Sequence, residues 1–185
     1  MSASRIETWI EQGYKLLGAE GFDGIKVERL ARLLNLNKSG FYHYFGDRQS
    51  YLEALVQYHI GLARSIAVEI SGLRNIDPDL LYLIVKHKLF FLVESQLLVK
   101  GRHALNCRNI DEAGDIINKE LLALWGNTQG VPGDMSVAYG YLNIIRHFIY
   151  ARIDAKNISY DFLHKLSVET GEVLEKTVRQ KSTGA

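Results

Sequence analysis

Two short amphipathic segments, residues 27–34 and 38–45, follow each other with only three residues between them. Apolar residues recur at helical spacing in the first segment, at Val27, Leu30, Ala31 and Leu34. Asn35 tolerates the left-handed conformation that ends a helix, and Asn37 is a favourable N-cap for the second segment. Two short helices joined by a tight turn are typical of a helix-turn-helix, and this pair determines how the N-terminal quarter of the chain folds.

Helical spacing of apolar residues continues through the rest of the 185-residue chain, without a clear alternating strand pattern. A capping box at Ser4 and Glu7 begins the first helix, which is expected to end near Glu20. Further helices are expected over 48–70, from Asp77-Pro78 to about 99, near 102–107, over 111–125, over 134–154 and from a cap at Ser159. A linker at 72–77 and a loop at 126–133 separate them. The sequence therefore predicts an all-α fold of about nine helices.

This pattern divides the chain into two expected domains. Residues 1–50 form a three-helix domain that contains the helix-turn-helix, and residues 51–185 form a larger helical domain. The long amphipathic helix expected at 48–71 connects the two.

Composition narrows the class of protein. With 47% hydrophobic residues the chain can bury a core, and its single cysteine, Cys107, excludes an internal disulfide framework. The N-terminus is charged too early for a secretory signal, and the most apolar window, 80–93, is interrupted by Lys86, His87 and Lys88. We therefore expect no membrane partner and a cytoplasmic location.

Positive charge is concentrated in the helix-turn-helix region. The net charge of the whole chain is only +1, but residues 26–48 carry five basic and two acidic side chains. A chain whose net charge is close to zero is not expected to coat nucleic acid indiscriminately. The local excess of positive charge at 26–48 is compatible either with a solvated helix face or with a localised contact to DNA.

The segment at 38–45 combines groups that suit the major groove of DNA. Its first turn, Lys38-Ser39-Gly40, offers backbone amides, a cation and a position without a side chain, where close approach is possible. Phe41 and Phe45, four residues apart, are expected to face the core. The remaining aromatic side chains, Tyr42, His43 and Tyr44, are expected to face outward, where they can reach phosphates or base edges.

Residues 4–55 resemble the DNA-binding domain of the tetracycline-repressor (TetR) family of bacterial regulators. The matching elements are Gly21-Phe22, Val27-Glu28-Arg29-Leu30-Ala31, the turn 35–37, the helix Lys38-Ser39-Gly40-Phe41-Tyr42-His43-Tyr44-Phe45, and Arg48 with Leu52. The resemblance implies a homodimeric, ligand-responsive transcriptional regulator, more often a repressor, that a small-molecule effector releases from a palindromic operator in double-stranded DNA.

The resemblance also implies roles for single residues. Lys38, Ser39 and Gly40 correspond to positions that contact bases or adjacent phosphates, Tyr42 to one that contacts a phosphate and a thymine methyl group, and Tyr44 to one near the groove. Two departures concern Lys26, which stands where a capping threonine is usual, and Asn35, which replaces a glycine; Arg48 replaces a phosphate-binding lysine. The full expected DNA-binding set is Lys26, Arg29, Asn37, Lys38, Ser39, Gly40, Tyr42, His43, Tyr44 and Arg48.

The part beyond residue 72 resembles the family in architecture alone, which implies a ligand-sensing and dimerisation domain whose last two helices pair with those of a second copy. The expected interface residues are Tyr141, Ile145, Phe148, Phe162, Leu166, Thr170, Val173 and Leu174. Aromatic surface with sparse polar groups suggests a ligand pocket. Its candidate residues are Tyr82, Lys86, Phe90, Arg102, His103, Cys107, Trp125, Tyr139, Asn143 and His147.

Several alternatives remain open from the residues. The apolar stripes of the last helices can close the core of a monomer, and a regulator-like protein can bind a ligand without binding DNA. A small helical enzyme is the third possibility, but Ser, His and Asp residues are scattered without a nucleophile elbow. His103 and Cys107, four residues apart, are too few to hold a metal ion alone, so we expect no metal, no cofactor and no enzymatic activity.

Overall fold

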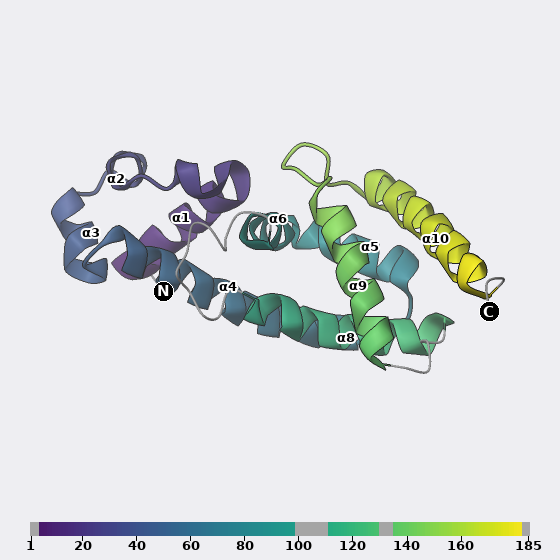
Figure 1. Cartoon of the computed structure of the whole chain (residues 1–185). Helices are drawn as coiled ribbons and strands as arrows, with labels where there is room; N and C mark the ends of the chain where they lie inside the picture. Colours follow the sequence, from purple (N-terminus) through teal and green to yellow (C-terminus); the bar gives the residue numbers. More distant parts are fainter. Residues whose placement is uncertain (1–3, 99–110, 130–134, 183–185) are drawn as a thin grey trace.

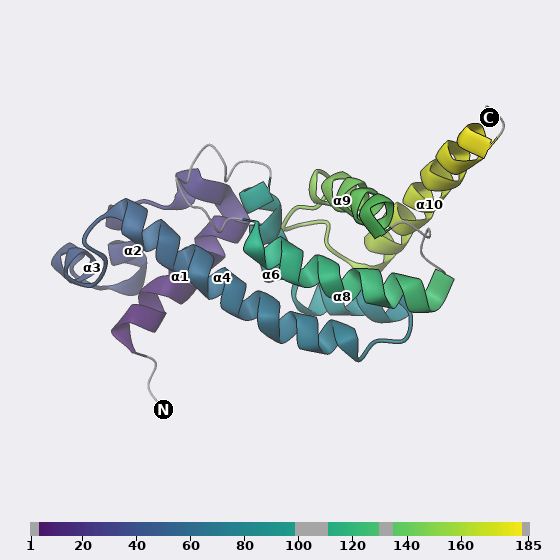
Figure 2. The same ribbon diagram turned by 60° about the horizontal axis from the view of Figure 1, so that its bottom comes forward.

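The computed structural model describes residues 4–98, 111–129 and 135–182, and within these ranges the chain is helical and contains no strand. The molecule is elongated (Figures 1 and 2): the N-terminal helices lie at one end, and the last helix, α10, lies at the other. This arrangement confirms the all-α fold with an N-terminal helix-turn-helix.

The N-terminal helices form where local signals place them. Helix α1 spans Arg5–Glu20 and begins with the capping box, in which Ser4 and Glu7 bond each other's backbone amides. A short 3₁₀ turn, Gly21–Gly24, leads to α2 at Val27–Leu34 and α3 at Lys38–Phe45. Asn35 between them has a φ of 52°, the left-handed conformation expected there.

Helix α4, Arg48–Ser71, runs from the helix-turn-helix into the rest of the molecule. The Asp47 carboxylate caps it by accepting from the amide of Ser50 at 2.7 Å. Helix α8, Glu112–Gln129, lies along α4, and α6, Lys88–Gln96, packs against α1 (Figure 2). These two packings join the N-terminal helices to the larger part of the chain.

The prediction of one continuous helix from Asp77 to about residue 99 is wrong. A short turn, η2 (Ile76–Leu80), in which Asp77 has an extended backbone (φ −115°, ψ 122°), precedes α5, Leu81–Lys86. Helix α6 begins only at Lys88. His87 leaves the helical conformation (φ −101°, ψ 29°), and its Nε2 lies 2.9 Å from Glu69 Oε1 on α4. Asp77 does not cap this helix, because its carboxylate bonds Tyr160 and His164 of α10 instead.

The loop expected at 126–133 begins later than the sequence suggests, because α8 continues to Gln129. Thr128 Oγ1 donates to the carbonyls of Leu124 and Trp125, which extends the bonded last turn past Gly126. Helix α9 spans Met135–Tyr150 and α10 spans Tyr160–Ser182, with Ser159 Oγ accepting from the amide of Phe162 as expected.

The core of the N-terminal part is built on aromatic side chains. Phe41 of α3 is fully buried and makes edge contacts with Trp9 of α1 and Tyr51 of α4, at ring separations of 5.5 and 4.9 Å. The Tyr51 hydroxyl donates to the carbonyl of Trp9 at 2.7 Å. One aromatic cluster therefore fixes α3 to both helices that flank it.

Two glycines in this region give a matched test of how closely α1 and α4 pack. A Cβ at Gly13 would overlap the hydroxyl of Tyr51, whereas a Cβ at Gly61, in the middle of α4, meets nothing within 4 Å. Gly13→Ala is therefore expected to lower the free energy of unfolding by about 1–3 kcal/mol through overpacking, as measured by urea denaturation. Gly61→Ala is expected to raise it by up to about 1 kcal/mol, because alanine favours the helix; equal effects would contradict the packing described.

Within the described ranges, no helix combines the length and the apolar character needed to cross a membrane.

Candidate nucleic-acid interface and ligand cavity

Helix α3 is held at its N-terminus by the turn that precedes it. The Asn37 side chain accepts from the amide of Ser39 at 3.0 Å, so this residue caps α3. Lys38 and Ser39 are exposed, and a Cβ at Gly40 would meet no atom within 4 Å. Glycine inside a helix costs about 1 kcal/mol relative to alanine, and no contact within the described chain requires it at this position. The first turn of α3 thus presents amides, a cation and an open backbone to the solvent.

The aromatic residues of α3 divide nearly as expected. Phe41 is buried and Phe45 is half-buried against Tyr51, while Tyr42, which is 50% exposed, and His43 face the solvent. Tyr44 was expected to face outward, but it is half-buried and packs against the core. The outward surface of α3 therefore consists of Tyr42 and His43, with Tyr44 at its edge.

Four Lys and Arg residues belong to the expected DNA-binding set, and the side chains of three of them already have partners within the chain. Lys38 Nζ lies 3.3 Å from Glu28 Oε1, an exposed ion pair beside the turn. Arg29 forms a two-pronged ion pair with Glu20, with Nη2 at 2.6 Å from Oε1, and this contact holds the pKa of the Glu20 carboxyl below its ordinary value. The Lys26 side chain is exposed and bonds no other residue in the described part of the chain.

Arg48 has a structural role that the sequence did not reveal. Its Nε donates to the carbonyl of Ile25 at 3.1 Å and its Nη2 to that of Phe22 at 3.0 Å. The guanidinium therefore ties the start of α4 to the segment before α2, and contact with a phosphate would need its remaining donors.

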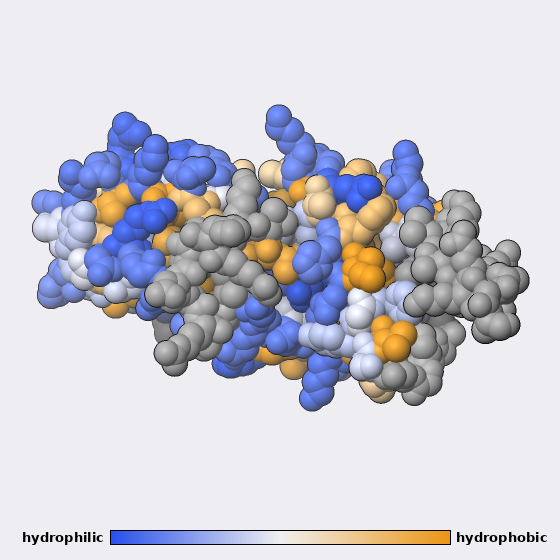
Figure 3. All heavy atoms as spheres, viewed as in Figure 1, coloured by the Kyte–Doolittle hydropathy of each residue, from blue (hydrophilic) through white to orange (hydrophobic). Residues whose placement is uncertain are grey.

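Apolar side chains are exposed along one face of α9 (Figure 3). Val137 and Ile144 are 44% and 63% exposed, and half-buried Tyr141 and Phe148 continue the same stripe at helical spacing. Tyr141 and Phe148 belong to the expected dimer surface, whereas Val137 and Ile144 were missed although their spacing of seven residues is a helical signal.

The other expected interface residues lie elsewhere. Leu166 and Thr170 are buried, Phe162 is half-buried against the core, and Ile145 and Thr170 line a cavity. Val173 and Leu174 lie on α10 beyond the residues whose side chains the structure describes.

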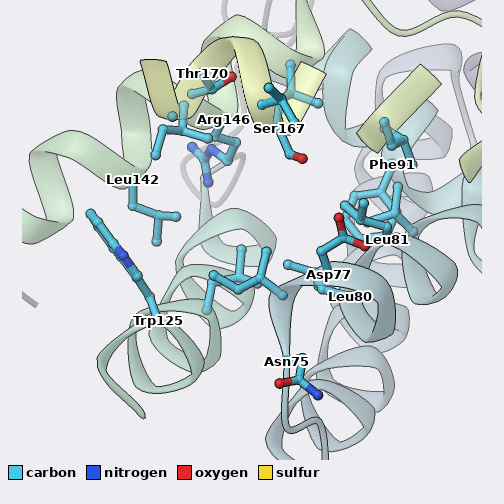
Figure 4. A pocket seen from close by; sticks show the side chains of 18 of the residues that line it. Asn75, Asp77, Leu80, Leu81, Phe91, Trp125, Leu142, Arg146, Ser167 and Thr170 are labelled. Atoms are coloured by element: carbon cyan, nitrogen blue, oxygen red, sulfur yellow. The ribbon is translucent and has the colours of Figure 1, made fainter. Parts of the chain in front are cut away.

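A cavity of about 560 Å³ lies among η2, α5, α6, α8, α9 and α10 (Figure 4). Its walls are mostly aliphatic and aromatic, and Figure 4 shows Trp125 and Leu142 on one side and Leu80, Leu81 and Phe91 on the other. Two charged side chains, Arg146 and Asp77, stand at different walls. A pocket of this size and character is typical of small-molecule sites.

Of the seven expected pocket residues within the described ranges, only Trp125 lines this cavity. Tyr82 is exposed and stacks on Tyr160, Lys86 pairs with Glu69 on the surface, and Phe90 is a core residue stacked on His59. Two further residues make polar contacts between α8 and α9: Asn143 accepts from the Asn118 amide, and the Tyr139 hydroxyl donates to Asp115. His147 is exposed, and its Nδ1 bonds the carbonyl of Asn143 within α9. Arg102, His103 and Cys107 lie outside the described residues.

A buried polar chain connects the N-terminal helices with the cavity. The Tyr14 hydroxyl on α1 lies 2.6 Å from His59 Nδ1 on α4, and His59 Nε2 lies 2.7 Å from Glu94 Oε2 on α6. Glu94 Oε1 is 3.8 Å from Nη1 of Arg146 on α9. Burial raises the pKa of the Tyr14 hydroxyl far above its ordinary value, so the phenol stays protonated and can donate to His59.

One feature of the sequence indicates these buried polar contacts, but it was not used in the predictions. His59 occurs at a core-facing position of α4, and Glu94 interrupts an apolar run, so both are polar residues at positions where the periodicity predicts burial. The pairing of these residues could not be read from their spacing, because each comes from a different helix.

Comparisons with known proteins agree with this geometry. Residues 10–55 match the sequence profile of the family described as "Bacterial regulatory proteins, tetR family". Three solved structures are similar in fold. The TetR-family transcriptional regulator PfmR from Thermus thermophilus is 18% identical (TM-score 0.57), with 83% of this chain and 88% of that one covered.

The second is a putative TetR-family regulator from Rhodococcus sp., 17% identical (TM-score 0.51), with 89% and 95% covered. The third, a putative TetR-family regulator from Mesorhizobium loti, is 12% identical (TM-score 0.56), with 92% and 96% covered. No curated protein shows significant sequence similarity to the chain. The matched family consists of regulatory proteins, in line with the expectation that the chain is not an enzyme.

Proposed function

We propose that this chain, which belongs to the TetR family of bacterial regulators by its N-terminal domain and fold, is a homodimeric, ligand-responsive repressor that binds a palindromic operator in the cytoplasm. The observation that carries the proposal is the capped first turn of α3, with exposed Lys38 and Ser39 and an open backbone at Gly40. A helix held in this way can enter the major groove by its N-terminal end.

The proposed contacts divide by chemistry. Ser39 and the amides near Gly40 meet phosphates or base edges, and Tyr42 and His43 extend the same surface. Lys38 reaches a phosphate by exchanging its exposed partner Glu28, an exchange that costs little because surface ion pairs contribute about 0–1 kcal/mol. Asn37, Arg29 and Arg48 orient the helix-turn-helix through their contacts within the chain, with Lys26 adding positive charge and Tyr44 packing at the edge.

A dimer supplies the second α3 helix that a palindrome requires. The apolar stripe on α9, with Val137 and Ile144 exposed and Tyr141 and Phe148 half-buried, supports an interface between two copies, since such a stripe is unfavourable in water. Two α3 helices in a dimer must stand about 34–36 Å apart to reach successive major grooves. A ligand in the cavity releases DNA if it binds a conformer with another separation more tightly.

Selection of bound fragments tests the proposal. Fragments of the source genome captured by the purified protein are expected to share a short palindrome, and binding is expected to weaken as salt rises. Equal binding to random DNA at moderate salt would contradict the proposal. It would favour the second candidate, a ligand-binding protein of the same fold without DNA recognition, for which the cavity of about 560 Å³ is the supporting observation.

Single substitutions test the proposed contacts. Tyr42→Ala and Lys38→Ala are each expected to weaken operator binding by about 1–3 kcal/mol, measured by fluorescence anisotropy at fixed salt. Lys38→Ala should also reduce the slope of affinity against salt by about one ion. Lys165→Ala, an exposed lysine on α10 at the opposite end of the molecule, is the control and should leave affinity unchanged. Unchanged affinity in both α3 variants would remove these residues from the interface.

A further inference from the structure

The geometry points to an amphipathic monocarboxylate as the class of molecule that the cavity binds, with Arg146 as the residue that receives the carboxylate. This assignment rests on the proposed function, in which the cavity holds the effector. It follows from the state of Arg146, from the position of Glu94 and from the walls of the cavity.

Arg146 lines the cavity as a buried cation, and two of its three guanidinium nitrogens have no hydrogen-bond partner. Its side chain is 9% exposed, and no hydrogen bond joins it to another described residue. Its Nε and Nη1 atoms are both buried without a partner. A guanidinium has five N–H donors and stays charged at any physiological pH, so burying it in this state is unfavourable unless an acceptor arrives.

Glu94 balances the charge of Arg146 without satisfying its donors. The gap of 3.8 Å between Oε1 and Nη1 is too long for a hydrogen bond, and the other oxygen of Glu94 is bonded to His59. Gly114 of α8 packs directly on this pair, where a Cβ would overlap Nη1 of Arg146. The absence of a Cβ at Gly114 therefore lets α8 pack closely on the pair without supplying an acceptor side chain, and the planar fork of Arg146 suits a second carboxylate.

The remaining walls determine the rest of the ligand. They are mostly apolar, so they favour an aliphatic or aromatic body over a sugar or a nucleotide. The other charged wall residue, Asp77, is already bonded by Tyr160 Oη at 2.7 Å and His164 Nδ1 at 2.5 Å. Asp77 stands at a different wall from Arg146 (Figure 4), so a carboxylate bound at Arg146 would not lie against it.

The test compares acids with alcohols of the same shape. Decanoate is paired with 1-decanol, and 4-phenylbutyrate with 4-phenylbutanol; binding is measured by isothermal titration calorimetry on the full chain without DNA. Quenching of Trp125, which lines the cavity, reports occupancy, and Trp125→Phe identifies the origin of that signal. We expect at least one acid to bind at least about tenfold more tightly than its alcohol.

The variants are chosen so that no buried charge is left alone. Glu94→Gln combined with Arg146→Met removes both charges and is expected to reduce the ratio of acid to alcohol affinity to about one. Arg64→Met combined with Glu112→Gln removes an exposed pair between α4 and α8, at 3.1 Å, and is the matched control that should keep the ratio. Melting temperatures of both double variants verify that they are folded.

The results separate this inference from the proposed function. Equal affinity for acid and alcohol in the unmodified protein, absence of binding by both acids, or an unchanged ratio in the Glu94/Arg146 variant would each overturn the inference. DNA capture is a separate measurement: operator binding without carboxylate preference would overturn the ligand class alone. Carboxylate preference that depends on Arg146, without DNA binding, would overturn the proposed repressor function alone.

Discussion

Replacing Phe41 by alanine is expected to lower the free energy of unfolding by about 3–5 kcal/mol, the range for removal of a buried aromatic side chain. Phe41 is fully buried, and its ring contacts Trp9, Phe45 and Tyr51. The cavity left at this position would remove the ring contacts by which α3 packs against both α1 and α4. Urea denaturation followed by circular dichroism measures the loss, and DNA binding is expected to fall with the folded fraction.

The neighbouring residue provides the control. Tyr42 is 50% exposed, so Tyr42→Ala is expected to change stability by no more than about 0.5 kcal/mol while weakening DNA binding. Two adjacent aromatic side chains would thus be separated into a stability effect and a binding effect. Similar stability losses in both variants would contradict the division of α3 into a buried face and a solvent face.

The second large effect is expected at Glu94. Glu94→Ala leaves Arg146 as a buried cation without a counter-ion and removes the acceptor of His59 Nε2, so the free energy of unfolding should fall by about 3–5 kcal/mol. Because the stability of a domain of this kind is about 5–15 kcal/mol, this loss is a large part of the total. Thermal and urea unfolding measure it.

Two comparisons identify the cause of that loss. Glu53→Ala, at an exposed position of α4, should change stability by no more than about 0.5 kcal/mol. The combined Glu94→Gln and Arg146→Met variant should recover much of the stability lost in Glu94→Ala, since no charge is then buried alone. If the double variant were as unstable as Glu94→Ala, the buried ion pair would not be the reason.

The helix-turn-helix could be predicted to the residue because its signals are local. Helix α2 ends at Leu34 because Asn35 adopts a left-handed conformation, and α3 begins at Lys38 because Asn37 caps it. Each of these interactions joins residues that are a few positions apart, so the sequence displays both partners together. The inward position of Phe41 follows in the same way from helical spacing.

The partners of Arg48 and the lining of the cavity could not be predicted, because they depend on packing between distant segments. Arg48 bonds the carbonyls of Phe22 and Ile25, which are 26 and 23 residues earlier in the chain. Ile145 and Thr170, expected at a dimer surface, line the cavity because α9 and α10 turn these side chains inward. Amphipathic spacing reveals that a helix has an apolar face, but not which neighbour covers it.

The ring of His59 allows contacts in both halves of the molecule to be observed by spectroscopy. Its Nδ1 contacts Tyr14 of α1, and its Nε2 contacts Glu94 of α6, next to the cavity. In a nuclear magnetic resonance spectrum of protein labelled with ¹⁵N in its six histidines, the two ring nitrogens of this residue give distinct signals. The pattern of the two shifts reports the tautomer of the ring, which depends on both contacts. A single side chain in the middle of α4 thus reports on its contacts with both α1 and α6 when a ligand or DNA is added.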